Sequence, residues 1–569
     1  MTTDSSDPIL GATLAIHYVP AANVRGEVAG ATWRYLLPDM ERQRVLCIGR
    51  PGAAASKALE YIAAEIVVLD GRGAGAVDGA VGRRPRRSSG AAVGAWLTAR
   101  PDATIDLIWV GPQGIGRDAG TVLSGSARLL ADGGVLVCED PAAVAALAGD
   151  AAPGGAAGAA ISGRIALVDV APTRGEIRSA VAGGDDDMAV SLSARGLAAT
   201  VPIRFVRVSK VHGRVMPSRR VPTRRIAIVS DGATLPDVPA YIADIAAADG
   251  VDLTGHRCGL SANGMYNTQK VLFVIAPPDT ATPSHVVKLT REPSVNARLE
   301  TERDALRRLE TLGLADGGGI PRVRFAGRHA GLAVVGETAV DGLPLSLSGG
   351  ADPLGRPIVG AIDWLVELGR RSMRMVAPTD VAAALAHLHE RYVALCQPPT
   401  AEVERLHAAI STIADSTAPF PIVFQHGDAG TWNLLVTPDE RVVFLDWENA
   451  EPAGMPLWDM FYLLRSHAVG VGRRKGARRR LTAVDRFLFD RSVLSELVVE
   501  ATTRYVSAIR LDPAMVEPLF HLCWMHQALK EATRFTPDRV RGAHFNRLLS
   551  LGLRRRNAPT LQRVFSIAR

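Results

Sequence analysis

The stretch that most constrains the fold of this chain is "QHGDAGTWNLLVTPDERVVFLDWENAE", residues 425–451. Two apolar runs, "NLLV" and "RVVFLD", flank the turn sequence "TPDE", a pattern typical of a β-hairpin. If the turn centres between Asp439 and Glu440, Asn433 lies directly opposite Asp446, with Cβ atoms about 5 Å apart. The pattern therefore predicts apolar strands that hold polar groups at their ends.

Polar groups in this arrangement suit metal and phosphate chemistry. An amide oxygen and a carboxylate at that distance could share a hard cation such as Mg²⁺, which prefers oxygen ligands. Asp428 lies in the loop before the hairpin, close enough to address a substrate beside the metal. A surface hairpin with Asp and Asn in turns is the common alternative. The combined pattern H-x-D-x-x-x-x-N followed by D-W-E favours a functional site.

These motifs resemble those of the aminoglycoside phosphotransferase and choline kinase superfamily, relatives of the protein kinases. "HGDAGTWN" and "FLDWE" are similar to the family's catalytic loop and metal-binding strand, and "EPAGMPLWDMFYLL" is similar to its stretch with a structural aspartate. The resemblance implies ATP and Mg²⁺ as cofactors. The roles that it implies are a catalytic base, Asp428; Mg²⁺ ligands, Asn433 and Asp446; supporting residues, His426 and Glu448; and the structural Asp459.

The segment upstream supplies a candidate cation for the nucleotide phosphates. In "SHVVKLT", Lys288 lies inside a predicted strand of a chain that has only six lysines. The helix predicted from "SVNARLETERDALRRLETLG" places Glu302 within an apolar stripe, at about 100° per residue. A carboxylate on a buried helix face is costly unless it is paired, so we expect an ion pair between Lys288 and Glu302. An exposed glutamate in a charged helix is the alternative.

The nucleotide-covering loop is expected in "CGLSANGMYNTQKVLFVI", where Ser261 and Gly264 precede an apolar strand. This segment is similar to the family's loop, and "DGLPL" resembles its hinge and the turn that follows. The resemblance covers about residues 250–470 and implies a bilobal, kinase-like domain. We expect a small lobe over residues 231–345 and a helical large lobe over residues 346–569.

The N-terminal part, residues 1–230, has a different pattern: short apolar strands alternate with helical segments between about 44 and 140. This alternation predicts a Rossmann-like, doubly wound α/β domain ahead of the α+β kinase-like domain. "RVLCIGRPGAAASKALEYIAAEIVVLD" resembles the opening of S-adenosylmethionine-dependent methyltransferases, with Gly49 in the loop and Asp70 where the family holds the ribose. Cys47 and a proline in the loop depart from that pattern, so a docking domain without methyl transfer stays open.

Composition sets broader limits. The chain has 569 residues, which suggests two to four domains at roughly 150 residues each. Its five cysteines lie far apart and its N-terminus lacks the blocks of a signal peptide, so we expect free thiols and a cytoplasmic protein. The net charge of +7 comes mostly from arginine. We expect the arginine clusters to be solvated loops or, alternatively, a docking surface for an anionic substrate or a peripheral membrane face. No motif suggests a nucleic-acid partner.

Three functions are compatible with these features. The leading one is an ATP-dependent kinase for a hydroxyl of a small molecule, sugar or glycan. As a separate prediction, the segment "GVGRRKGARRR", with Arg473, Arg474 and Arg478, recognises an anionic acceptor. The alternatives are a bifunctional kinase–methyltransferase acting on a glycan or lipid-linked sugar, and a non-catalytic pseudokinase scaffold. Binding of S-adenosylmethionine separates the first two, and failure to bind Mg·ATP would favour the third.

Overall fold

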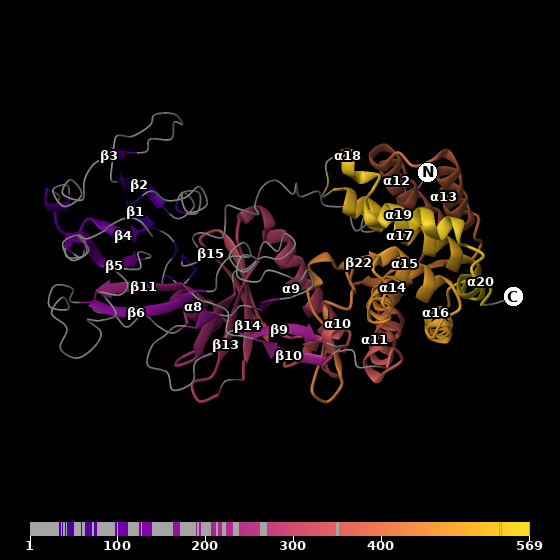
Figure 1. Ribbon diagram of the computed structural model, residues 1–569, viewed down its shortest axis with the longest axis horizontal. Helices are drawn as coiled ribbons and strands as arrows, with labels where there is room; N and C mark the ends of the chain where they lie inside the picture. The colour runs from indigo at the N-terminus through magenta and orange to yellow at the C-terminus, as the bar shows by residue number, and fades with distance from the viewer. Residues whose placement is uncertain are drawn as a thin grey trace, which may run out of the picture.

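In the computed structural model, the chain forms three parts that follow one another along the longest axis (Figure 1). In Figure 1 the N-terminal sheet lies at the left, a second sheet in the middle and a helical part at the right. The structure describes residues 238–261, 270–348 except 281, and 352–567 except 534 and 536; between residues 34 and 231 it describes the strands given below and a few short segments.

Seven strands form the N-terminal sheet, in the order β3-β2-β1-β4-β5-β11-β6. Strands β2, β1, β4 and β5 run parallel, whereas β3, β11 and β6 pair antiparallel with their neighbours. The apolar segments predicted as strands are therefore strands, while the Rossmann-like assignment of the whole domain stays a prediction. The bounds are β1 Arg42–Ile48, β2 Ala63–Asp70, β3 Gly73–Ala76, β4 Ile105–Val110, β5 Leu130–Cys138, β6 Gly163–Val170 and β11 Arg224–Asp231.

Short strands link this part to the second sheet. β7 (Ala189–Val190), β9 (Val206–Val211) and β10 (Arg214–Ser218) form a three-stranded sheet. β8 (Ser193–Ala194) pairs with β12 (Arg257–Ser261) and so adds an edge strand to the second sheet. Residues from both sides of the predicted boundary at 230/231 thus share one sheet, and the exact domain limits stay a prediction.

The second sheet has the order β15-β16-β14-β13-β12-β8. The two apolar runs predicted as strands, in "QKVLFVI" and "SHVVKLT", form β13 (Lys270–Ala276) and β14 (His285–Thr290), which pair antiparallel. Helix α9 (Asn296–Thr311) follows β14 and buries Leu299, Leu306 and Leu309 together with Glu302, so the predicted apolar stripe is present. The remaining bounds of this part are α8 Ala240–Ala248, β15 Val323–His329 and β16 Leu332–Thr338.

Beyond β16 the described chain is mostly helical, as its sequence predicts. One apolar core joins these helices; it includes Leu306 and Leu309 of α9, because that helix packs against the large lobe as well as against the second sheet. The helices are α10 Leu345–Ser348, α11 Arg356–Ser372, α12 Pro378–Cys396, α13 Thr400–Ala414, α14 Trp458–Arg474, α15 Arg480–Val484, α16 Ser495–Ala508, α17 Val516–Ala532, α18 Pro537–Val540, α19 His544–Arg554 and α20 Pro559–Phe565. The short strands are β17 Leu343–Pro344, β18 Arg374–Val376, β19 Phe420–Gln425 and β22 Glu451–Gly454.

The predicted hairpin is present as β20 (Leu434–Val436) and β21 (Val442–Phe444), but its register differs by one residue from the expected one. The Leu445 N–H donates to the Asn433 carbonyl oxygen at 2.8 Å, so Asn433 faces Leu445. The expectation that Asn433 lies directly opposite Asp446 was wrong.

The turn explains this shift. The Thr437 N–H donates to the Arg441 carbonyl oxygen at 2.9 Å, which closes a loop of three residues. The last of the three, Glu440, has a left-handed φ of 62°. Three-residue hairpin loops commonly combine a tight turn with one left-handed residue, whereas the sequence alone suggested an even-numbered turn.

Two wider expectations can be compared with the structure. The five cysteines are free, as predicted, and all five are buried. Among the described residues, none of the helices combines the length and apolar character that crossing a bilayer requires.

Candidate active site

Two lysines on one face of the second sheet form the centre of the candidate site. Lys288 on β14 lies directly across from Leu272 on β13, and Lys270 is two residues before Leu272, so both lysines point to the same side of the sheet. Glu302 of α9 contacts both, with one carboxylate oxygen 2.6 Å from the Lys288 Nζ and the other 2.8 Å from the Lys270 Nζ. The ion pair predicted from the sequence is present, and a second lysine joins it.

Three further carboxylates complete this group. The Lys288 Nζ is 2.9 Å from Glu337 Oε2, and the Lys270 Nζ is 2.8 Å from both Asp446 Oδ1 and Glu448 Oε2. Side chains of the second sheet therefore meet the D-W-E segment of the large lobe. We call this group the lysine cluster; its members are Lys270, Lys288, Glu302, Glu337, Asp446 and Glu448.

Burial and charge act in opposite directions on these groups. Burial by itself raises the pKa of Glu302, but Lys270 and Lys288 outweigh it and hold that pKa at about 2. For Glu337 burial is the larger effect and raises the pKa to about 7, although Lys288 opposes it. Burial lowers the pKa of Lys270, and the carboxylates of Asp446, Glu302 and Glu448 more than reverse this and raise it. At neutral pH Glu302 is therefore ionised, whereas Glu337 is near its midpoint.

The D-W-E segment has an unusual backbone. Asp446 has a φ of 66°, in the left-handed region that residues with a Cβ rarely adopt, and it precedes the 3-10 turn η4 (Trp447–Asn449). The Trp447 N–H donates to Glu302 Oε1 at 3.2 Å, and the Trp447 ring lies 4.3 Å from the His426 ring, centroid to centroid. Strain of this kind persists where the surrounding structure fixes the backbone. Here Lys270 holds the Asp446 side chain, and Glu302 and His426 hold the next residue, Trp447.

The predicted catalytic loop, residues 426–433, is held largely through its backbone. The N–H groups of His426 and Gly427 donate to the two carboxylate oxygens of Asp459 in α14, at 2.5 and 3.0 Å. Gly427 has a φ of 77°, and a Cβ at this position would collide with the carbonyl oxygen of Asn449. Only glycine fits this position, because both the backbone conformation and the close contact exclude a side chain.

Asp428, the candidate base, is positioned by Asn433. The Asn433 Nδ2 donates to the Asp428 carbonyl oxygen at 3.0 Å and to its Oδ2 at 3.1 Å, which leaves the Asn433 Oδ1 as the atom able to face a cation. Burial raises the pKa of Asp428, whereas Lys530 and His426 lower it. Lys530 of α17 donates to the Gly427 carbonyl oxygen at 3.0 Å, beside the candidate base.

The oxygen atoms around Asp446 suit a divalent cation. Within the described part of the chain, no three His, Cys, Asp or Glu side chains are grouped as a metal site. Mg²⁺ does not need such a group, because it commonly uses one or two carboxylates together with substrate phosphates. Asp446, Glu448 and the Asn433 Oδ1 offer oxygen ligands, and the Lys270 ammonium group already places a cation between Asp446 and Glu448. The donor set therefore fits Mg²⁺.

The other predicted site residues lie in two further places. Ser261 is the last residue of β12, and Gly264 lies outside the described residues. Gly49 follows β1 and Asp70 ends β2, so both lie at the carboxyl edge of parallel strands in the N-terminal sheet. Gly49 has a φ of 91°, and its N–H donates to the Leu69 carbonyl oxygen at 2.8 Å. The structure thus brings Gly49 and Asp70 to one sheet edge, in a different part from the lysine cluster.

Three charged residues of the site were not predicted: Lys270, Glu337 and Lys530. For the two lysines a signal was available, because the chain has six lysines and three of them lie in this site. The scarcity that pointed to Lys288 applies equally to Lys270 and Lys530. Glu337 offered no such signal, since a glutamate at the end of a strand is ordinary.

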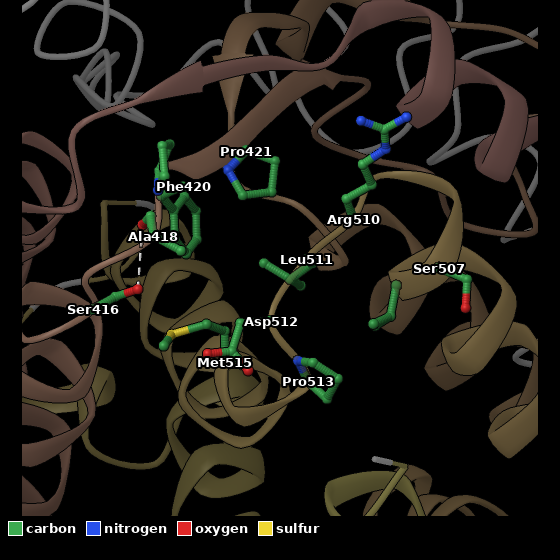
Figure 2. Close-up of a pocket in the computed structure, with 12 residues that line it drawn as sticks. Ser416, Ala418, Phe420, Pro421, Ser507, Arg510, Leu511, Asp512, Pro513 and Met515 are labelled. Atoms are coloured by element: carbon green, nitrogen blue, oxygen red, sulfur yellow. Dashed lines mark hydrogen bonds between the residues drawn. The ribbon is translucent and has the colours of Figure 1, made fainter.

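A separate cavity of about 390 Å³ lies elsewhere in the large lobe (Figure 2). Figure 2 shows Phe420 and Pro421 at the start of β19 on one side of it, and Arg510 to Met515, the segment after α16, on the other. None of the predicted site residues lines this cavity. Its lining includes no residue of the lysine cluster or of the catalytic loop, so it is separate from the candidate active site.

Residues 270–497 match the model of the phosphotransferase enzyme family. The match begins at Lys270 and includes the whole lysine cluster and the catalytic loop. Residues 270–497 are therefore similar to the phosphotransferase enzyme family, and the predicted enzyme class, a phosphotransferase, is confirmed. A comparison with curated proteins gives no match.

Solved structures of kinase-like proteins show weak similarity. An aminoglycoside phosphotransferase from Streptomyces rimosus, solved with ADP and streptomycin, is 17% identical with a TM-score of 0.32, over 53% of this chain and 99% of that one. A choline/ethanolamine kinase family protein from Mesorhizobium loti is 15% identical with a TM-score of 0.30, over 54% and 91%. WbdD, solved with a kinase inhibitor, is 12% identical with a TM-score of 0.25, over 90% and 88%.

Proposed function

We propose that this protein is an ATP-dependent phosphotransferase that transfers the γ-phosphate to a hydroxyl group of a small molecule, sugar or glycan. The lysine cluster carries the proposal: Glu302 contacts Lys288 and Lys270, and Lys270 contacts Asp446. Candidate phosphate-binding and metal-binding groups that are far apart in the sequence are thereby adjacent. Phosphoryl transfer requires this combination of a cation for the phosphates, a group that orients it and a carboxylate for the metal.

Each residue has a distinct role in this proposal. Asn433 and Asp446 would hold Mg²⁺, which when bound would neutralise charge on the phosphates. Lys288 binds phosphate oxygens while Glu302 fixes its position. Asp428 accepts the hydrogen bond of the acceptor hydroxyl, orients it and takes its proton as the new oxygen–phosphorus bond forms. The bond between the γ-phosphorus and the β,γ-bridging oxygen breaks in the same transfer, and ADP leaves with that oxygen. His426 and Glu448 are supporting residues, the first beneath Trp447 and the second beside Asp446.

The size of each contribution follows from the reaction type. Positioning and charge neutralisation dominate, because the transition state of phosphoryl transfer is loose. A general base contributes roughly 10²–10⁴-fold, or about 3–5 kcal/mol of barrier. Burial raises the pKa of Asp428 and so makes it a stronger base, while Lys530 and His426 favour its ionised form.

Aromatic side chains next to Asp428 support a ring-bearing acceptor such as a sugar. Trp432 is 43% exposed, although it is a large apolar residue. Its indole packs closely over Gly430, where a Cβ would collide with it, and its ring meets that of Tyr462 edge-on at 5.9 Å. A hydrogen bond from Tyr462 also lowers the pKa of Asp428, which places Tyr462 beside the candidate base. A fixed, exposed aromatic plane at this point suits the apolar face of a sugar ring.

The test is transfer of labelled γ-phosphate from ATP into an extract of host metabolites and lipid-linked glycans. Wild type would be compared with Asp428→Ala and Asp446→Ala. A labelled product formed by wild type and by neither variant supports the proposal and supplies the acceptor for identification. Formation of the same product by Asp428→Ala at the wild-type rate contradicts the assigned base. Absence of product together with failure to bind Mg·ATP contradicts the proposal and favours a scaffold.

A second candidate function rests on the N-terminal sheet. Gly49 and Asp70 lie at the carboxyl ends of neighbouring parallel strands, β1 and β2, where open α/β sheets bind ligands. This position supports S-adenosylmethionine binding and a bifunctional kinase–methyltransferase. Burial raises the pKa of the Cys47 thiol to about 12, so Cys47 is inert and does not replace the acidic residue of the resembled family. Calorimetric titration with S-adenosylmethionine, with Asp70→Ala beside wild type, tests this candidate: no heat of binding to wild type would rule it out.

A further inference from the structure

We propose that Lys270 is a second phosphate-binding lysine and that, before the nucleotide binds, its ammonium group occupies the cation position between Asp446 and Glu448. The inference rests on the proposed function of the lysine cluster. It assigns to Lys270 two successive partners: the carboxylates of the metal site without nucleotide, and the nucleotide phosphates with it.

The contacts of Lys270 are those of a cation among oxygen ligands. Its Nζ lies 2.8 Å from one oxygen each of Glu302, Asp446 and Glu448. No such set surrounds Lys288, which has two carboxylate partners and reaches neither Asp446 nor Glu448 within ion-pair distance. The two lysines therefore differ in position: Lys288 lies against Glu302 and Glu337, and Lys270 lies at the candidate metal ligands.

The lysine cluster contains more carboxylates than positively charged groups, so it can accept a further cation. Two ammonium groups face four carboxylates, and Lys270 alone faces three of them. Arg298 adds one guanidinium, 3.9 Å from Glu448, so three positive groups still meet four carboxylates. The Glu302 side chain is fully buried, whereas the Asp446 side chain is 35% exposed, so the cluster opens towards solvent at Asp446. An arriving cation or phosphate group therefore meets the cluster on the side where Lys270 holds Asp446.

Lys270 and a divalent cation compete for this position. Both would share the same carboxylate oxygens of Asp446 and Glu448, and two positive charges at such separations repel each other strongly. The Lys270 side chain can move its ammonium group away from Asp446 and Glu448, because a lysine carries a point charge on a flexible four-carbon stem. The phosphates of a nucleotide offer Lys270 new anionic partners beside Lys288, since both lysines stand on the same face of the sheet.

This arrangement couples metal binding to nucleotide binding. Without nucleotide, Lys270 excludes the divalent cation; with nucleotide, Lys270 turns to the phosphates and the metal position becomes free. Linkage is reciprocal, so the metal must strengthen nucleotide binding by the same factor by which the nucleotide strengthens metal binding. Removal of the Lys270 charge should reduce this coupling.

The experiment measures two affinities without catalysis: that for Mn²⁺ in the absence of nucleotide, by electron paramagnetic resonance of free Mn²⁺, and that for ADP in the presence of EDTA, by calorimetry. Lys270→Gln should bind Mn²⁺ about tenfold or more tightly than wild type, and should bind metal-free ADP more weakly. Lys475→Gln, which removes an exposed lysine at the end of α14, serves as the matched control and should change neither affinity.

The proposal predicts opposite changes in the two affinities of Lys270→Gln, tighter for Mn²⁺ and weaker for ADP, which distinguishes it from a structural role of Lys270. A lysine that only stabilises the fold would, when removed, weaken both affinities. Lys270→Arg keeps a cation and should keep Mn²⁺ weakly bound; a gain of Mn²⁺ affinity equal to that of Lys270→Gln would overturn the proposal. Unchanged or weaker Mn²⁺ binding by Lys270→Gln would also overturn it, provided that wild type binds Mn·ADP. If wild type does not bind Mn·ADP at all, the proposed function fails, and this inference with it.

Discussion

The lysine cluster and the catalytic loop contribute to the same candidate site but are held in place by different forces. In the lysine cluster, side-chain charges contact one another: two ammonium groups meet four carboxylates at 2.6 to 2.9 Å. In the catalytic loop the main contacts are made by the backbone: the N–H groups of His426 and Gly427 donate to the Asp459 carboxylate. Contacts between charged side chains therefore hold the lysine cluster in place, and backbone hydrogen bonds hold the catalytic loop in place.

This difference predicts how each region responds to change. Buried charges depend strongly on one another, so removal of one partner leaves another uncompensated. A backbone-held loop tolerates changes of charge but depends on conformation and on close contacts. Substitutions in the catalytic loop, apart from the proposed metal ligand Asn433, should therefore affect turnover or folding of the loop, whereas substitutions in the lysine cluster should affect stability and the binding of nucleotide and metal.

The largest expected effect is on turnover and separates the two regions most clearly. Asp428→Ala should lower kcat by roughly 10²–10⁴-fold, because it removes the candidate base. Its affinity for Mg·ADP should equal that of wild type, since Asp428 is not part of the lysine cluster. Steady-state kinetics and calorimetry would measure the two quantities. Asp415→Ala, at an exposed helix end, is the control. A parallel loss of nucleotide affinity would show that the two regions are not separable.

The next effect is on stability and acts on the lysine cluster. Glu302→Gln leaves Lys270 and Lys288 without their shared partner and should lower the free energy of unfolding by about 3–5 kcal/mol at pH 7. The Glu302 pKa of about 2 lies below its ordinary value, so the stability from its ionisation is present above about pH 4.5 and is lost as the pH falls towards 2. Urea unfolding at several pH values would show this dependence in wild type and its absence in the variant.

Glu300→Gln on the same helix is the control for this prediction. Glu300 pairs with Arg328 near the surface, and exposed pairs contribute at most about 1 kcal/mol. Equal losses of stability in Glu302→Gln and Glu300→Gln would contradict the view that the lysine cluster depends on buried charge.

A third effect tests the backbone of the catalytic loop. Gly427→Ala should lower the free energy of unfolding by about 1–3 kcal/mol through its φ of 77° alone, and by more because its Cβ collides with the Asn449 carbonyl oxygen. Gly250→Ala is a matched control, because Gly250 has a φ of 76° and open space around the position of a Cβ. Urea unfolding of both variants isolates the close contact, and equal losses would show that the contact is unimportant.

The fold was predictable where local pattern decides it. The antiparallel pairing of β13 and β14, the apolar stripe of α9 and the helical large lobe all follow from periodicity in the sequence. The hairpin was predictable in kind but not in register, because the number of residues in its turn depends on whether Glu440 adopts a left-handed conformation. A glutamate carries no signal for that conformation, unlike Gly or Asn.

The site was predictable where one residue implies a partner. A buried Glu302 requires a cation, and the rarity of lysine pointed to Lys288, so that pair could be found. Lys270 reaches the same carboxylate from a neighbouring strand, and Lys530 reaches Gly427 from α17, 103 positions later in the chain. Contacts of this kind depend on how segments that are distant in the sequence pack together, which no local pattern encodes.

A smaller effect is expected at the end of α14, outside both regions. If Arg473, Arg474 and Arg478 recognise an anionic acceptor, their joint change to Ala should raise the acceptor KM about three- to tenfold, as expected for partly exposed charges. kcat and nucleotide affinity should stay at wild-type values. Steady-state kinetics with an anionic and a neutral acceptor would measure this, and an unchanged KM for the anionic acceptor would show that these arginines do not recognise it.

The smallest expected effect concerns Lys530, a charged residue that contacts the backbone of the catalytic loop. Lys530 lowers the pKa of Asp428, against the larger effect of burial, so Lys530→Met should raise that pKa. Asp428 must be ionised to accept a proton, and the acid limb of the kcat/KM profile should therefore move to higher pH. Well above the limb the two proteins should have similar rates, because Asp428 is ionised in both.

The conservative variant completes this test. Lys530→Arg keeps the positive charge and a donor for the Gly427 carbonyl oxygen, so its acid limb should coincide with that of wild type. If both variants lower the rate equally at every pH, Lys530 acts on the conformation of the loop rather than on the charge of Asp428. In that case the catalytic loop depends on backbone geometry even where a charge lies next to its candidate base.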